Sequence, residues 1–233
     1  MGSAKNILAF ALFLFLSINS VNGQSAALAD QYLLQAEDFK KNSQPDNAVI
    51  FYEKAALEFQ TLGNVEKFIY SCNQIGIILT RQDKYEKAKT YLDKALSAGL
   101  SSPAADPLSI ATTYISLGVI FSAEEKYDQS LIYHHKALSI RLSRLGENNG
   151  EVATSYGNIG NVYRRQKNFD KSIEAHKKAL KIRKKVFGEQ SVEIIESYNG
   201  LGNAYKEKKD YRKSLAYFEK ALKNKIIQRG QGH

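Results

Sequence analysis

The sequence has little of several residue types on which other classes of protein depend. It contains one cysteine, three prolines, one methionine and no tryptophan. Because Cys72 is the only cysteine, an intrachain disulfide is excluded. We expect its thiol to be buried as a small apolar group, with a reactive thiol as the alternative. The scarcity of proline suits a chain made mostly of helices.

Motifs for catalysis are also missing. The sequence contains no G-x-S-x-G, H-E-x-x-H, C-x-x-C or Walker motif, and no G-x-G-x-x-G placed after a strand. No segment alternates long enough between apolar and polar residues to predict a strand. We therefore expect no catalytic residue and no cofactor, and we predict that the chain is not an enzyme.

One apolar run stands apart from the rest of the chain. Residues 7–16 are all apolar, Lys5 precedes them, and a small, polar stretch follows as far as Gly23. This layout is typical of a secretory signal peptide, and the run is shorter than the roughly 20 residues that a membrane-spanning helix needs. We expect cleavage after Gly23 and export to the periplasm or the medium, with an uncleaved anchor as the alternative. No membrane span is expected in the mature chain.

A repeat organises the remainder. Gly76, Gly118, Gly160 and Gly202 are separated by 42 residues each, and an aromatic residue and an Ala-Leu pair recur with the same spacing. An earlier copy, around Ala36, lies 40 residues upstream of the second. Repeats of this length predict a stacked array of small structural units in place of one globular core.

Each copy is predicted to form two antiparallel helices. In the fourth copy Tyr156, Ile159, Gly160 and Tyr163 share one helical face. A glycine inside a helix costs about 1 kcal/mol relative to alanine. We interpret the repeated glycine as the place where the second helix approaches the first closely. His134 and His176 occupy the position of Leu92 and Phe218, so we expect them to pack between repeats and not to bind metal.

The pattern resembles the tetratricopeptide repeat family. In the last copy it is carried by Tyr198, Leu201, Gly202, Tyr205, Ser214, Phe218 and Ala221. The usual repeat has 34 residues, and the longer spacing here resembles the kinesin-light-chain type in a secreted, bacterial-type protein. The resemblance implies an all-α, right-handed α-solenoid of five helix-turn-helix repeats.

The predicted domain organisation follows from this alignment. Residues 1–23 form the signal peptide, residues 29–228 the array, and residues 229–233 a tail or the start of a truncated further repeat. The repeats are expected at about residues 29–62, 69–102, 111–144, 153–186 and 195–228. Between the second and third, we expect a lengthened loop in which Gly99 ends one helix and Pro107 begins the next.

Positive charge is concentrated in the last two repeats. From Glu151 onward there are 19 basic and 9 acidic residues, so the net +9 of the chain lies entirely in this part. Five lysines project from the second helix of the fourth repeat: Lys177, Lys178, Lys181, Lys184 and Lys185. We interpret them as a solvated outer face, with a binding patch as the alternative.

The resemblance implies a binding groove lined by the first helices. The residues placed there are Asn73, Ile77, Asn158, Asn161, Arg164, Arg165, Asn199, Asn203 and Lys206. An asparagine amide both donates and accepts hydrogen bonds, so it can bind the backbone of an extended peptide. The alternative is that asparagine at this position belongs to the scaffold of the family.

These observations predict an exported scaffold that binds a protein or an extended peptide, with acidic side chains favoured. One alternative is that the array is the recognition portion of a longer enzyme, a caspase-like peptidase or a sensor kinase, truncated at residue 233. Another is a nucleic-acid-binding array that uses the basic C-terminal repeats, although an exported chain would seldom meet nucleic acid. We also expect the uncapped last repeat to offer a surface for self-association.

Overall fold

The computed structural model describes residues 23–230. The predicted signal peptide lies outside these residues except for Gly23, as do residues 231–233 of the predicted tail. Cleavage after Gly23 therefore stays a prediction.

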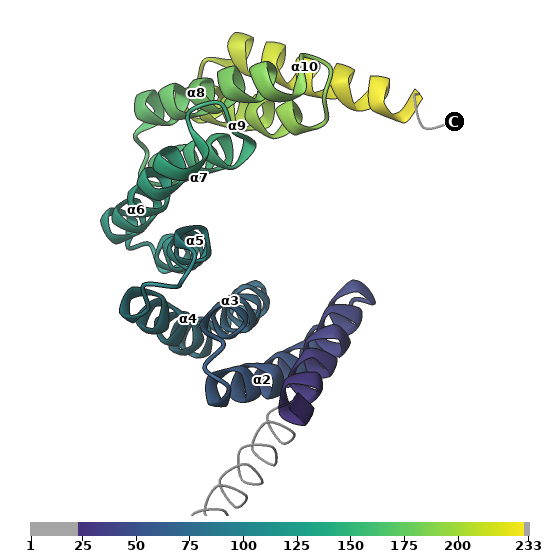
Figure 1. Ribbon diagram of the computed structural model, residues 1–233. Coiled ribbons are helices and arrows are strands. Elements are labelled where there is room, and N and C mark those ends of the chain that lie inside the picture. The colour runs from purple at the N-terminus through teal and green to yellow at the C-terminus, as the bar shows by residue number, and fades with distance from the viewer. Residues whose placement is uncertain (1–22, 231–233) are drawn as a thin grey trace, which may run out of the picture. The chain divides into compact units, whose positions relative to one another are not determined.

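Helices make up all the regular structure of the described residues (Figure 1). The chain is helical over residues 23–41. The helices that follow are α2 (Pro45–Thr61), α3 (Val65–Arg81), α4 (Tyr85–Ser101), α5 (Pro107–Ala123), α6 (Tyr127–Leu145), α7 (Gly150–Arg165), α8 (Phe169–Phe187), α9 (Glu193–Glu207) and α10 (Tyr211–Gly230). Successive helices form pairs, so the predicted class, an all-α helical-repeat solenoid, is confirmed.

The chain divides into two compact units, Met1–Ile110 and Ala111–His233. The division falls inside α5, whereas the sequence predicted one continuous array. In the first unit, α2 packs on α3 and α3 on α4. In the second, each helix from α6 to α10 packs on the next, and the first helices α7 and α9 also touch each other.

The turn within each helix pair has a fixed backbone geometry. Its central residue adopts a left-handed conformation, with φ between 56° and 68°, at Ser43, Asp83, Glu125, Lys167 and Lys209. None of these residues is a glycine, although glycine adopts this conformation at the least cost. The turns that lead from one pair to the next instead use Gly63, Gly146 and Gly188, with φ between 69° and 85°.

The repeated glycines lie where the two helices of a pair approach each other. A Cβ atom on Gly160 would stand 2.8 Å from the His176 ring, and one on Gly76 would stand 2.5 Å from Leu92 Cδ2. Gly118 faces His134 and Gly202 faces Phe218 in the same way. The interpretation of these glycines as close-approach positions is confirmed.

The expected boundary at Gly99 is wrong. Helix α4 continues to Ser101, and Gly99 lies inside its last turn, where a Cβ would stand 2.8 Å from Ile110 Cγ1. The glycine is therefore explained by packing against α5 and not by the end of a helix. Pro107 does begin α5, as predicted.

Candidate functional site

The first helices of the last two repeats carry a stripe of amide side chains. Asn158 and Asn161 lie on α7 and Asn203 on α9. Asn161 and Asn203 are 42 residues apart and occupy the same position in their repeats. Residues three or four apart share a helical face, and α7 contacts α9. We call this surface, defined by these three asparagines, the amide face.

The amide groups of this face are not used within the part of the chain that the structure describes. Asn158 and Asn161 are half-buried, and Asn203 is exposed. Within the described residues, none of the three side chains forms a hydrogen bond. Other asparagines of the chain do so: Asn168, for example, accepts from the Lys171 backbone N–H at the start of α8. The amide face therefore presents donors and acceptors that solvent or a ligand must satisfy.

The charged residues beside these amides differ in their availability. Arg164 forms an ion pair with Glu207 of α9, and Arg165 donates to the Ser122 carbonyl oxygen of α5 at 3.4 Å. Lys206 is exposed and forms no ion pair among the described residues. Of the three predicted cations, Lys206 is thus the one whose charge is not matched by an acid or a hydrogen bond from any residue between 23 and 230.

Asn73 does not lie at a ligand-facing position. Its side chain is 2% exposed, and Nδ2 donates to the Ser109 carbonyl oxygen at 3.1 Å. The residue therefore joins α3 to the start of α5 in the first unit. Ile77, also on α3, is half-buried.

Asn199 occupies the position of Asn73 in the last repeat, 126 residues later. It is exposed and lines a cavity of about 570 Å³ between α9 and α10, together with Val192, Phe218 and Leu222. The structure thus assigns this position to the boundary with a neighbouring helix. Of the two residues that the sequence had placed in the groove, Asn73 is thus buried in the first unit, whereas Asn199 is exposed on α9, four residues before Asn203.

The two histidines on second helices are buried, and the predicted packing between repeats is confirmed for His176. His176 is 2% exposed and lies between Gly160 of α7 and Gly200 of α9, so it packs between two repeats. His134, also 2% exposed, packs on Gly118 within its own pair. Burial lowers the pKa of each imidazole to about 4, helped at His176 by nearby arginines. Both rings are therefore neutral at pH 7.

Two buried arginines were missed by the sequence reasoning. Arg141 of α6 is 8% exposed and Arg183 of α8 is 3% exposed. Their Nη1 atoms donate to the hydroxyl groups of Ser155 and Ser197, at 3.0 Å and 2.7 Å. The arginines are 42 residues apart, as are the serines, so the repeat spacing was the available signal. These pairs join a second helix to the first helix of the next repeat.

Three further features bear on what the described residues can do: metal-binding groups, the single thiol and membrane-spanning helices. No group of histidine, cysteine and acidic residues among them could hold a metal ion. Cys72 is 1% exposed, and burial raises the pKa of its thiol to about 12, so the thiolate is scarce at neutral pH. No helix between residues 23 and 230 is long and apolar enough to cross a membrane.

Comparison with known proteins identifies the repeat. The family model described as "Tetratricopeptide repeat" matches residues 69–143 and 151–226. Comparison with curated proteins found no match.

Several solved structures are similar in fold. BtubC (BKLC) from P. vanneervenii has a TM-score of 0.77 and 21% identity, with 99% of this chain and 94% of that chain covered. A putative kinesin light chain from Podospora anserina has a TM-score of 0.69 and 14% identity, with 88% and 97% covered. MamA has a TM-score of 0.56 and 19% identity, with 84% and 96% covered.

Proposed function

The chain belongs to the tetratricopeptide repeat family and is a protein-interaction scaffold; from this premise we propose that it binds an extended segment of another protein on the amide face. The observation that carries the proposal is the set of unused amides of Asn158, Asn161 and Asn203. Each amide offers a donor and an acceptor, which match the N–H and C=O groups of a peptide backbone. Such contacts are independent of the ligand's side chains.

Charge gives the ligand its preferred composition. Lys206 lies beside the amide face and has no partner among the residues that the structure describes, and the second unit has a large excess of basic residues. An acidic side chain next to the bound backbone is therefore favoured by Coulomb attraction, which is weakened by salt because the surface is exposed. We propose an acidic segment as the ligand of this face.

A peptide-library selection against the whole chain would supply ligands for a direct test. The affinity of each selected peptide is then measured by calorimetric titration with the native chain and with the double variant Asn161→Ala/Asn203→Ala. Lys223→Ala, on the exposed surface of α10, is the control. Loss of affinity in the double variant alone supports the amide face, whereas equal affinities in all three proteins contradict it.

We further propose that the chain acts after export, because residues 1–23 have the layout of a signal peptide. Intact-mass measurement of the protein recovered from the periplasm or the medium provides the test. A mass that begins at Gln24 supports the proposal, and a mass that retains residues 1–23 contradicts it.

A further inference from the structure

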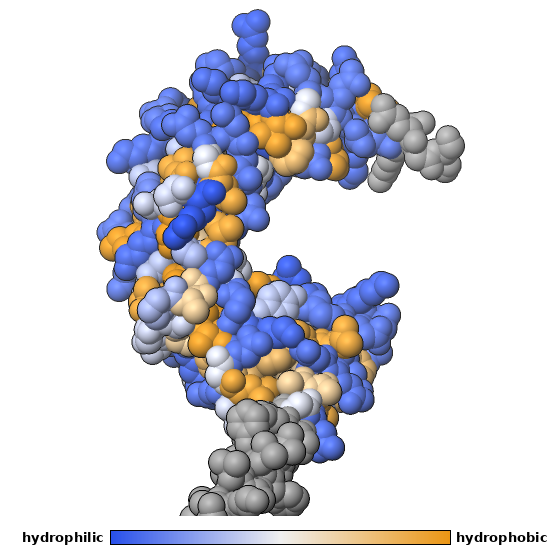
Figure 2. Space-filling model, in the orientation of Figure 1, coloured by the Kyte–Doolittle hydropathy of each residue, from blue (hydrophilic) through white to orange (hydrophobic). Residues whose placement is uncertain are grey.

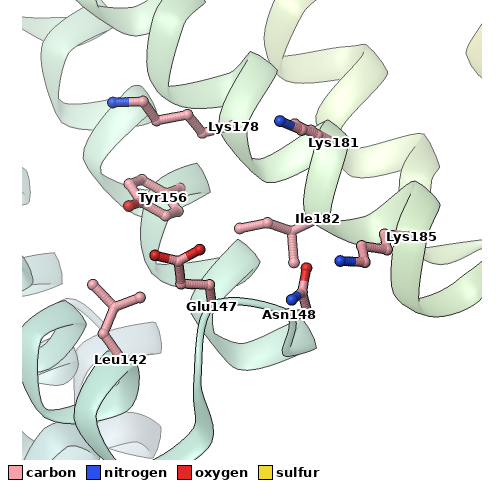
Figure 3. Close-up of a pocket in the computed structure, with 8 residues that line it drawn as sticks. All are labelled: Leu142, Glu147, Asn148, Tyr156, Lys178, Lys181, Ile182 and Lys185. Atoms are coloured by element: carbon pink, nitrogen blue, oxygen red, sulfur yellow. The ribbon is translucent and has the colours of Figure 1, made fainter.

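A second surface, on the helix that the amide face does not use, has the features of a recognition site. A cavity of about 330 Å³ lies between the end of α6, the loop that follows it, Tyr156 of α7 and the outer side of α8 (Figure 3). Its lining combines apolar side chains with the lysines of α8. We call it the lysine pocket, defined by Leu142, Tyr156, Lys178, Lys181, Ile182 and Lys185.

The apolar part of the pocket is fixed by the core. Leu142, Tyr156 and Ile182 are half-buried and pack against the hydrophobic cluster of Leu138, Val152, Ile159 and Ala175. These side chains are therefore held in place whether or not a ligand is present. They offer a preformed apolar surface of a size that suits one side chain of a ligand.

Lys178 is explained by the repeat itself. It forms an ion pair with Glu174 at 2.8 Å, and its Nζ lies 5.8 Å from the centre of the Tyr156 ring. In each of the four remaining repeats the lysine at this position also lies over an aromatic ring: Lys54, Lys94, Lys136 and Lys220. This cation–π contact belongs to the packing within each repeat of this chain and indicates nothing about a ligand.

Lys181 and Lys185 have no such explanation. Both are exposed, and neither forms an ion pair or a hydrogen bond within the described residues. The second and third repeats have serine at both positions: Ser97 and Ser139, Ser101 and Ser143. A serine is therefore sufficient for the fold at these positions, and the positive charges are additional.

The additional charges lie together and lower the stability of the helix. Lys181 and Lys185 are four residues apart on α8, and like charges at this spacing repel each other and destabilise a helix. Figure 3 shows both side chains on the pocket side of α8, with Lys185 extended toward Asn148. Glu147 is the one acidic residue in the lining, which leaves a net charge of +2 with the three lysines.

A second cavity extends the site along α8. It has a volume of about 240 Å³ and shares Tyr156 and Lys178 with the lysine pocket. Its lining also includes Ile159, Tyr163, Lys171 and Glu174, so it too combines apolar and charged side chains. In Figure 2, hydrophilic residues cover most of the surface in the upper part of the view, where Figure 1 places α8 and α10. Two adjoining cavities fit neighbouring side chains of one chain better than they fit a single small ion.

We propose that the lysine pocket binds an acidic peptide segment of a partner protein, in which an apolar side chain is flanked by aspartate or glutamate. The apolar side chain packs on Leu142, Tyr156 and Ile182. Its acidic neighbours pair with Lys181 and Lys185. The site lies on a second helix and adds a contact independent of the amide face. The apolar surface of Leu142, Tyr156 and Ile182 favours a peptide over a phosphate backbone, which has no apolar side chain to place there.

The experiment uses two labelled peptides and the whole chain. In the first peptide a leucine is flanked on each side by three acidic residues, and in the second the acids are replaced by their amides. Affinity is measured by fluorescence anisotropy with the native chain, with Lys181→Glu/Lys185→Glu, and with Lys177→Glu/Lys223→Glu. The last variant reverses the same number of exposed charges outside the pocket.

The proposal predicts that the acidic peptide binds the native chain at least tenfold more tightly than the amide peptide. It further predicts that the Lys181/Lys185 reversal weakens binding at least tenfold and that the control reversal weakens it less than threefold. Equal effects of the two reversals would show that net charge alone attracts the peptide, and absence of binding would also overturn the proposal.

Two further measurements identify the site and the class of ligand. The acidic peptide should shift the backbone amide resonances of residues 142–156 and 178–185. Shifts confined to Asn158, Asn161 and Asn203 would overturn the proposal while supporting the amide face as a binding site. An oligo-thymidine that displaces the peptide, and that depends equally on Lys181 and Lys185, would assign the pocket to nucleic acid instead.

Discussion

Arg183 of α8 donates from Nη1 to the hydroxyl oxygen of Ser197 on α9, across a distance of 2.7 Å. The guanidinium group is buried between the two repeats, and its Nη2 forms an ion pair with Glu196, whose side chain is 59% exposed. Arg141 forms the same type of contact with Ser155 one repeat earlier, at 3.0 Å. Polar contacts thus recur between successive repeats of the second unit, beside the apolar clusters.

Replacement of Arg183 by alanine should lower the free energy of unfolding by about 2 kcal/mol. The change removes hydrogen bonds worth about 0.5–1.5 kcal/mol each and leaves a gap between α8 and α9. Glu196 can turn to solvent, so no buried charge is left behind. Urea denaturation followed by circular dichroism measures the effect. The control, Arg144→Ala on the exposed end of α6, should change the free energy by less than about 0.5 kcal/mol.

Two glycines of the last repeats should respond to alanine in opposite directions. A Cβ on Gly200 would stand 2.4 Å from the His176 ring, so Gly200→Ala should destabilise the protein by about 1–3 kcal/mol. A Cβ on Gly157 would meet only Glu196 Oε1, at 3.9 Å. Gly157→Ala should therefore stabilise the protein by up to about 1 kcal/mol through helix propensity. Melting temperatures of equal or reversed order would contradict the packing described for His176.

The buried histidines should make stability depend on pH. The pKa of His134 falls from its ordinary value of 6.5 to about 4 in the folded chain. Between these values the unfolded chain binds more protons, so the stability is fully present above pH 6.5 and is lost as pH falls toward 4. The loss is worth about 1.4 kcal/mol for each pH unit in this interval. His176, with the same direction and value, adds to it.

The variant His134→Leu provides the check, because Leu92 occupies the same position in the second repeat. Its urea midpoint should fall less between pH 7 and pH 4.5 than that of the native chain. Ser139→Leu is the control, since Ser139 is exposed on the same helix and carries no titratable group. A native-like pH slope in His134→Leu would show that the buried ring does not cause the acid lability.

Glycine at turn position 167 should make the protein more stable than the native Lys167 does. Its φ is 61°, a conformation that costs an L-residue roughly 1 kcal/mol and costs glycine little. Lys167→Gly should therefore raise the free energy of unfolding by up to about 1 kcal/mol. Lys177→Gly, inside the exposed surface of α8, should lower it by about 1 kcal/mol. Thermal denaturation of the two variants provides the measurement. If both melting temperatures change in the same direction, the left-handed conformation assigned to Lys167 is wrong.

The sequence was sufficient for the fold because the repeat places equivalent residues in equivalent contacts. The spacing of Gly118, Gly160 and Gly202 predicted where two helices meet. The burial of His134 and His176 was predicted because other repeats have an apolar residue, Leu92 or Phe218, at the same position. The periodicity of the sequence indicates the helical face on which a residue lies. It does not indicate which neighbouring residue contacts that face.

The candidate site was harder to predict because it depends on what covers each position. Asn73 and Asn199 have the same place in the repeat, yet the first is buried by α5 and the second is exposed. Likewise, the sequence predicted Arg164 as a cation available to a ligand, but in the structure it forms an ion pair with Glu207. The contact between one helix and the next decides such cases, and a single repeat does not contain that information.

The amides of Asn161 and Asn203 give the most direct test of ligand binding. One hydrogen bond contributes about 0.5–1.5 kcal/mol net, so each single Asn→Ala change should weaken binding of a selected peptide roughly tenfold or less. If the two sites act independently, the double variant should lose the sum of the two free energies. Neither amide is bonded within the described protein, so the melting temperature should change little. A double variant that binds with native affinity, while Lys181→Glu/Lys185→Glu does not bind, would place recognition on α8 and remove the amide face from it.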